Sequence, residues 1–118
     1  MAHKVFKVDT ANKATGTYYS LDLKAPTGLN YVPMWGPIIL NLDPLPTGCS
    51  IDCYYELDKS GTFIQAKLEG NTASFSTVGG TEAVFLVGEK AKIFGVELVL
   101  HPSVNTTPEI YQVEVLFE

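Results

Sequence analysis

The sequence predicts an all-β protein built as a single antiparallel β-sandwich, jelly-roll-like, with about nine short strands. Three observations favour this fold class. Short segments either alternate apolar and polar residues or are continuously apolar. Turn-forming residues separate these segments at uneven intervals, which favours a sandwich over a regular up-and-down barrel. No helix start signal is followed by an apolar pattern with a period of 3.6 residues.

The chain of 118 residues is long enough for one hydrophobic core and too short for two. We therefore expect a single domain that covers residues 1–118. The predicted strands are 3–9, 17–24, 38–42, 49–57, 62–68, 73–78, 83–87, 91–100 and 109–117.

The first two predicted strands lie at 3–9 and 17–24. The first is short and flanked by lysines, as edge strands often are, because charge discourages pairing with another chain. Residues 10–16 are polar and rich in turn formers, so we expect a connection there. Strand 17–24 alternates cleanly and should direct Leu21 and Leu23 to the same face as Tyr19.

Residues 25–37 (APTGLNYVPMWGP) form the least regular segment. Three prolines and two glycines exclude a helix and interrupt any ladder, so we expect a long loop that carries Tyr31, Met34 and Trp35. Exposed on a loop, these side chains could stack on a sugar ring or fill a partner's pocket. They could equally fold inward and cap one end of the sandwich. Tyr31, Met34 and Trp35 are the candidate interaction residues.

The stretch 49–67 is the centre of the predicted sheet. Residues 49–57 alternate, with Ile51, Cys53 and Tyr55 on the apolar face. Residues 58–61 (DKSG) predict a turn in which Gly61 takes a left-handed conformation. Strand 62–68 should then return as the second half of an antiparallel hairpin.

The C-terminal third contains three further well-marked strands. Residues 83–87 (AVFLV) are entirely apolar, which predicts a strand deep in the core, and 88–90 should form a turn. Gly95, in the middle of strand 91–100, suggests a bulge or a close backbone approach. Strand 109–117 should direct Tyr111 inward together with three later residues of the same parity.

The two long C-terminal strands supply the expected packing partners of the central strand. The inward residues of 49–57 should meet the apolar faces of 91–100 and 109–117. The expected partners are Phe94, Val96, Leu98, Val113 and Val115.

Composition and charge exclude several classes of function. The net charge is -5 and all basic residues are lysines, so the chain lacks the arginine fork used to bind phosphate and guanine, and we expect no nucleic-acid partner. No run of about 18 apolar residues predicts a membrane span, and the first residues lack an apolar signal core. Cys49 and Cys53 on one extended strand would lie about 13 Å apart, too far for a disulfide. Two core thiols suit assembly in a reducing cytoplasm.

No residue set predicts a reaction, a metal site or a cofactor. The carboxylates of the central hairpin are expected to be solvated rather than tuned for acid–base catalysis. Oxygen ligands for calcium are present, but no calcium-loop motif joins them. His3 and His101 are far apart in sequence and lack partners for zinc. The carboxylates considered for catalysis are Asp52, Glu56 and Asp58, and those considered for calcium are Asp22, Asp43 and Asp58.

Residues 45–117 resemble a β-sandwich module of tailed-bacteriophage virion proteins. The likeness is carried by LPTGCSIDCYYELDKSGTF, by the strands AVFLV and GEKAKIFGVELVL, and by the closing TPEIYQVEVLFE. It covers about two thirds of the chain, and its motifs are structural.

The resemblance implies a non-enzymatic virion component, assembled in the host cytoplasm, that docks on capsid, tail or baseplate in several copies. Its partners would be other virion proteins and further copies of itself. The alternative is a carbohydrate- or host-receptor-binding module that uses Tyr31 and Trp35.

Overall fold

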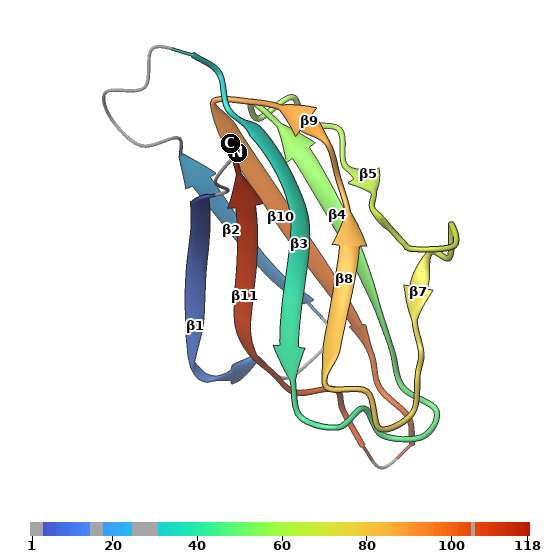
Figure 1. Cartoon of the computed structure of the whole chain (residues 1–118). Helices are drawn as coiled ribbons and strands as arrows, with labels where there is room; N and C mark the ends of the chain where they lie inside the picture. Colours follow the sequence, from blue (N-terminus) through green and yellow to red (C-terminus); the bar gives the residue numbers. More distant parts are fainter. Residues whose placement is uncertain (1–3, 15–17, 25–30, 105) are drawn as a thin grey trace.

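Two antiparallel sheets pack face to face, with sheet A in front of sheet B in Figure 1. The computed structural model describes residues 4–14, 18–24, 31–104 and 106–118. Sheet A has the order β1-β11-β3-β8-β6, with β9 also paired to β3, and sheet B has the order β2-β10-β4-β5, with β7 also paired to β4. The strands are β1 (Lys4–Ala14), β2 (Tyr18–Lys24), β3 (Met34–Leu42), β4 (Ser50–Leu57), β5 (Ile64–Gln65), β6 (Lys67–Leu68), β7 (Ser74–Phe75), β8 (Glu82–Leu86), β9 (Glu89–Lys90), β10 (Ile93–His101) and β11 (Ile110–Phe117).

The strand order confirms the predicted jelly-roll-like sandwich. β1 pairs with β11, β2 with β10, β3 with β8 and β4 with β5, so the chain is folded back on itself and wound into two sheets. β11 also pairs with β3, and β10 with β4, which completes each sheet. This nesting of early and late strands is the double Greek key of a jelly roll. Four of the strand segments, β5, β6, β7 and β9, contain only two residues each.

The apolar face of the central strand, β4, points into the core as predicted. Ile51, Cys53 and Tyr55 of β4 are buried and pair with β10 residues that are also buried. The register places Leu100 opposite Ile51, Leu98 opposite Cys53 and Val96 opposite Tyr55. Residues that are directly opposite on neighbouring strands share a face, so these six side chains form one apolar layer between the sheets. Val113 and Val115 of β11 enter the same core from sheet A.

The turn predicted at 58–61 is present, but the second strand predicted for the hairpin, 62–68, pairs with β4 only in part. Asp58 and Lys59 have φ values of 50° and 55°, and the Ser60 amide donates to Leu57 O at 3.1 Å, which is a type I′ turn. Only β5 returns along β4. Ala66 is buried and donates its amide to Cys53 O, after which β6 pairs with β8 of sheet A. The segment predicted as one strand at 62–68 therefore crosses from one sheet to the other.

The prediction of a loop as far as Pro37 is wrong, because β3 begins at Met34. Trp35 pairs with Phe117 and Ile38 with Val115, so Gly36 and Pro37 together oppose a single residue of β11. Such a bulge has no ladder bond at the extra residue, which is where a sheet tolerates a proline. β3 can therefore contain Pro37, the residue that led us to expect a loop.

Two predicted core positions lie outside the core. Leu86 of β8 is 52 % exposed, because only alternate residues of this apolar run, Ala83 and Phe85, face sheet B. Tyr111 is 45 % exposed, because the β11–β3 register shifts between Ile110 and Gln112 and places Ile110 in the core instead. A shift of one residue exchanges the two faces of a strand.

Several strand boundaries also differ from the prediction. β1 continues to Ala14 through residues expected to form a loop, with an irregular register between Asp9 and Ala14. The strand predicted at 73–78 is reduced to β7. The turn predicted at 88–90 contains β9, which pairs with the start of β3.

Candidate functional site

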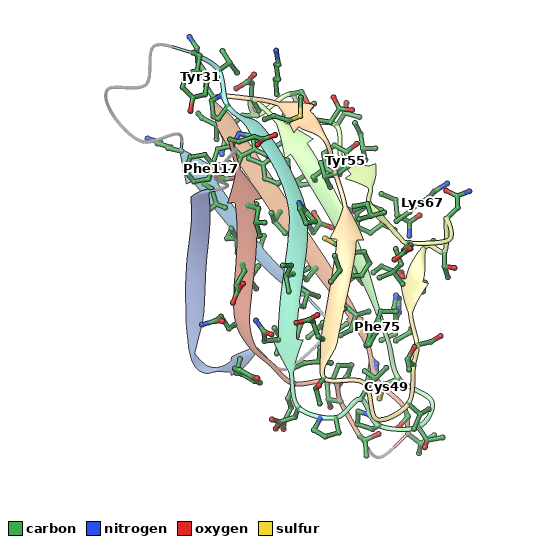
Figure 2. All side chains as sticks on the ribbon, in the orientation of Figure 1. Tyr31, Cys49, Tyr55, Lys67, Phe75 and Phe117 are labelled. Carbon is green, nitrogen blue, oxygen red and sulfur yellow. The ribbon has the colours of Figure 1, made fainter. Side chains whose placement is uncertain are left out.

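One end of the sandwich carries a cluster of exposed apolar side chains at the beginning of β3. Tyr31 is 50 % exposed, and Val32 and Met34 are exposed to a similar degree. Together with Lys90 and Glu118 they line a shallow, open depression. Figure 2 places the labelled Tyr31 at this end of the molecule, next to the start of β3. We call these five residues the Met34 surface.

Backbone pairing on both sides holds Met34 in place. The Met34 amide donates to Glu118 O at 2.8 Å, and the Glu118 amide donates back to Met34 O at 2.9 Å. On its other side Met34 pairs with Lys90 of β9. Directly opposed residues project to the same face of a sheet, so Lys90, Met34 and Glu118 form a row across three chain segments. The charges in this row flank an apolar centre.

Trp35 points the other way and belongs to the core. Its side chain is 0 % exposed, and its indole Nε1 donates to Ala91 O at 2.7 Å. The ring stacks on Phe94 with centroids 5.3 Å apart and contacts Phe117 at 5.0 Å. A strand directs successive residues to opposite faces, so an exposed Met34 requires an inward Trp35. Of the three candidate interaction residues, Tyr31 and Met34 lie at the surface and Trp35 is buried. A buried Trp35 cannot stack on a sugar ring, as the carbohydrate-binding alternative requires.

Two carboxylates of the central hairpin stabilise the backbone. Asp58 Oδ1 accepts hydrogen bonds from the amides of Lys92 and Ile93 at 2.7 and 3.0 Å, which fixes the start of β10. Glu56 Oε2 accepts from the Gly61 amide at 2.8 Å and closes the turn. Glu56 is buried, so the prediction of a fully solvated acidic face is wrong at this position.

Gly95 explains how Glu56 fits there. A Cβ at position 95 would lie 3.0 Å from Asp22 Oδ1 and 3.3 Å from Glu56 Cβ. The close neighbours of Gly95 are side-chain atoms and not the backbone that the sequence led us to expect. The β10 register with β2 and β4 is continuous there, so no bulge is present. Asp22 in turn pairs with Lys59 Nζ at 2.7 Å.

Asp52 is the centre of a polar cluster that the sequence did not reveal. The Ser74 hydroxyl donates to Asp52 Oδ1, and His101 Nε2 lies 2.8 Å from Asp52 Oδ2. The residue types are those of a hydrolase triad, but both partners bind the carboxylate. In a catalytic triad the histidine lies between the serine and the acid and accepts the serine proton. The arrangement found here connects β7 and the end of β10 to β4 and contains no activated nucleophile.

The contacts of Asp52 change the expected effect of Asp52→Asn. From the sequence we expect less than about 0.5 kcal/mol, as for a surface position. The Asp52 side chain is only 14 % exposed and holds two partners. We now expect the substitution to lower the free energy of unfolding by about 1–2 kcal/mol, since hydrogen bonds to a charged group are the stronger ones. Urea unfolding measures this. Glu69→Gln, at an exposed turn carboxylate, is the control and should stay within about 0.5 kcal/mol; equal values for both variants would contradict the assigned contacts.

The cysteines are core residues. Cys49 and Cys53 are both buried and unbridged, as the sequence predicts. Burial, with a smaller contribution from the charge of Asp52, raises the pKa of the Cys53 thiol well above its usual range. The Cys53 thiol therefore stays protonated near neutral pH and is a poor nucleophile.

The described part of the chain contains no group of three or more His, Cys, Asp or Glu side chains placed to hold a metal ion. Of the calcium candidates, Asp22 is paired with Lys59 and Asp58 with backbone amides. His3 lies outside the described residues. Within those residues no helix is long and apolar enough to cross a membrane.

Comparison with known proteins does not place the chain in a family. No protein-family description matches the sequence, and no curated protein matches it either. A solved structure of infectious bursal disease virus, strain Gx, contains a chain that superimposes with a TM-score of 0.49 at 11 % identity. The match covers 99 % of this chain and 32 % of that one, so this chain spans about a third of its length. That virus is a birnavirus and not a phage. At this level of similarity the match carries no inference about function.

Proposed function

We propose that this protein is a non-enzymatic structural component of a tailed-phage virion. It docks on the capsid, tail or baseplate in several copies, and the Met34 surface makes the contact. The resemblance of residues 45–117 to phage virion modules supports the virion assignment, and the exposed apolar cluster supports the contact site. The jelly roll itself serves many functions and only provides the rigid scaffold.

The observation that carries the proposal is the composition of the Met34 surface together with the backbone pairing of Met34. Tyr31, Val32 and Met34 expose apolar area beside one another, while the backbone beneath Met34 is hydrogen-bonded on both sides. Apolar and aromatic anchors on a preorganised backbone are what protein–protein contact sites use, because little conformational entropy is lost on binding. A rim that contains Lys90 and Glu118 fits the usual anatomy of such a site.

The polar clusters support a structural role over an enzymatic one. The three carboxylates considered for catalysis all accept hydrogen bonds that hold strands or turns together. No described buried side-chain nitrogen or oxygen lacks a hydrogen-bond partner. Active sites usually leave groups unpaired or shift their pKa values.

Particle composition tests the proposal. Mass spectrometry of phage particles purified from cells that express this protein should find it in stoichiometric amounts. Met34→Asp, which places a charge in the contact, should fold normally and be depleted at least about tenfold from particles, as loss of a contact anchor implies. The matched control is Val78→Asp, at another exposed apolar residue (59 % exposed), which should be incorporated normally. Absence of the wild-type protein from particles would overturn the virion assignment, and normal incorporation of Met34→Asp would overturn the contact site.

A further inference from the structure

We infer that Met34 is an oxidation site, and that its conversion to methionine sulfoxide by a hydroperoxide blocks docking through the Met34 surface. The effect on docking rests on the proposed function, whereas the oxidation itself depends only on where the sulfur atoms of the free chain lie. Met34 lines the open depression at the end of the sandwich together with Tyr31 and Val32.

Solvent reaches the side chain of Met34 and not those of the two cysteines. Among the sulfur-containing residues that the structure describes, Met34 is 39 % exposed, whereas Cys49 and Cys53 are 2 % and 0 % exposed. Oxidants attack cysteine through the thiolate, and the buried Cys53 thiol stays protonated near neutral pH. Cys49 is enclosed beside Thr106, with its Sγ 3.5 Å from the Thr106 carbonyl oxygen. An oxidant in solution therefore meets the Met34 thioether first.

The reaction is a two-electron oxidation of the Met34 thioether. The sulfur attacks one oxygen of the hydroperoxide, so that an S–O bond forms and the O–O bond breaks. The oxygen bound to sulfur loses its proton to the leaving hydroxide or alkoxide, which departs as water or an alcohol. The reverse step, which methionine sulfoxide reductases catalyse, oxidises two thiols to a disulfide and releases the oxygen as water.

Oxidation should change the surface and leave the fold intact. The sulfoxide of a free chain is hydrated, and the backbone of Met34 stays paired with Glu118 and Lys90. In a docked chain the same polar group is buried in an apolar contact, which costs free energy unless a hydrogen-bond donor meets it. The oxidised chain should therefore keep its thermal unfolding midpoint and lose affinity for its docking partner.

Hydrogen peroxide treatment of the purified, folded chain tests the oxidation site. Peptide mass spectrometry should find one added oxygen on Met34, formed at a rate within about threefold of that in the urea-unfolded chain, because exposure governs this reaction. Alkylation after the treatment should find Cys49 and Cys53 still as thiols. Met34→Leu, which nearly conserves volume and apolar character, is the control and should take up no oxygen at position 34. Oxidation of either cysteine before Met34, or oxidation of Met34 only after unfolding, overturns the site.

Binding to phage particles assembled without this protein tests the effect on docking. The peroxide-treated wild type should bind about tenfold more weakly than the untreated chain, as burial of an unpaired polar group implies. A methionine sulfoxide reductase with a thiol reductant should restore binding, and Met34→Leu should bind equally before and after peroxide. Unchanged binding of the sulfoxide form overturns the block.

Failure of this block and failure of the proposed function are separate results. If the untreated wild type binds no particles, the virion assignment and the block both fail, whereas the oxidation site is judged from the free chain alone. If Met34→Asp is depleted from particles but the sulfoxide form binds normally, the contact site stands and the block by oxidation is wrong.

Discussion

Replacing Ile51 by aspartate is expected to prevent folding. Ile51, the second residue of β4, is 0 % exposed and faces sheet A across the core. An aspartate there would bury a carboxylate among apolar side chains with no described partner, at a cost comparable to the whole stability of a domain of this size, about 5–15 kcal/mol. Far-UV circular dichroism and thermal unfolding should show no cooperative transition.

Ile64→Asp is the matched control for this experiment. It makes the same substitution on the neighbouring strand β5, where the side chain is 43 % exposed. The variant should fold, with a free energy of unfolding within about 1 kcal/mol of the wild type. A folded Ile51→Asp with the stability of Ile64→Asp would show that Ile51 does not face the core.

Trp35→Ala should cost about 3–5 kcal/mol of folding free energy. The indole is fully buried between Phe94 and Phe117, and truncation leaves a large cavity as well as an unpaired carbonyl at Ala91. Guanidinium unfolding measures the loss. Tyr31→Ala, four residues earlier and half exposed, should change stability by less than about 0.5 kcal/mol.

Fluorescence gives a second reading of the same position, because Trp35 is the single tryptophan. Its emission should be blue-shifted in the native protein, protected from acrylamide, and red-shifted on unfolding. A native emission maximum equal to that of free indole would contradict the burial of Trp35. It would support an exposed Trp35, which the glycan-binding alternative needs.

Strands that are marked by a regular alternation of apolar and polar residues could be predicted from the sequence. Every second residue is apolar and buried from Ile51 to Tyr55 in β4 and from Phe94 to Leu100 in β10, and a half-buried strand with an uninterrupted ladder follows that period. Where the ladder is interrupted, prediction failed. The bulge at Gly36 and Pro37 and the register shift beside Tyr111 depend on the partner strand, which no local window contains. The crossing of the chain at Ala66 likewise depends on where the edge of each sheet lies.

The same distinction applies to the candidate site. Tyr31 and Met34 were found because a proline-rich aromatic segment is unusual, whereas the inward direction of Trp35 follows only once β3 is known to begin at Met34. The contacts of Asp52 with Ser74 and His101 join residues 22 and 49 positions apart in sequence. They follow from the β4–β7 and β4–β10 registers, and the alternation of β4 and β10 alone could have suggested that Asp52 and His101 share a face.

Amide hydrogen exchange, compared between the dilute chain and the chain in assembled particles, tests most directly whether the Met34 surface is the functional site. Backbone amides that an interface covers exchange more slowly than in the free protein. We expect added protection at the amides of residues 31, 32, 34, 89, 90 and 118, and unchanged exchange around Asp52, Ser74 and His101. Protection confined to the Asp52 cluster or to β5 and β7, with residues 31–34 unchanged, would contradict the proposed function.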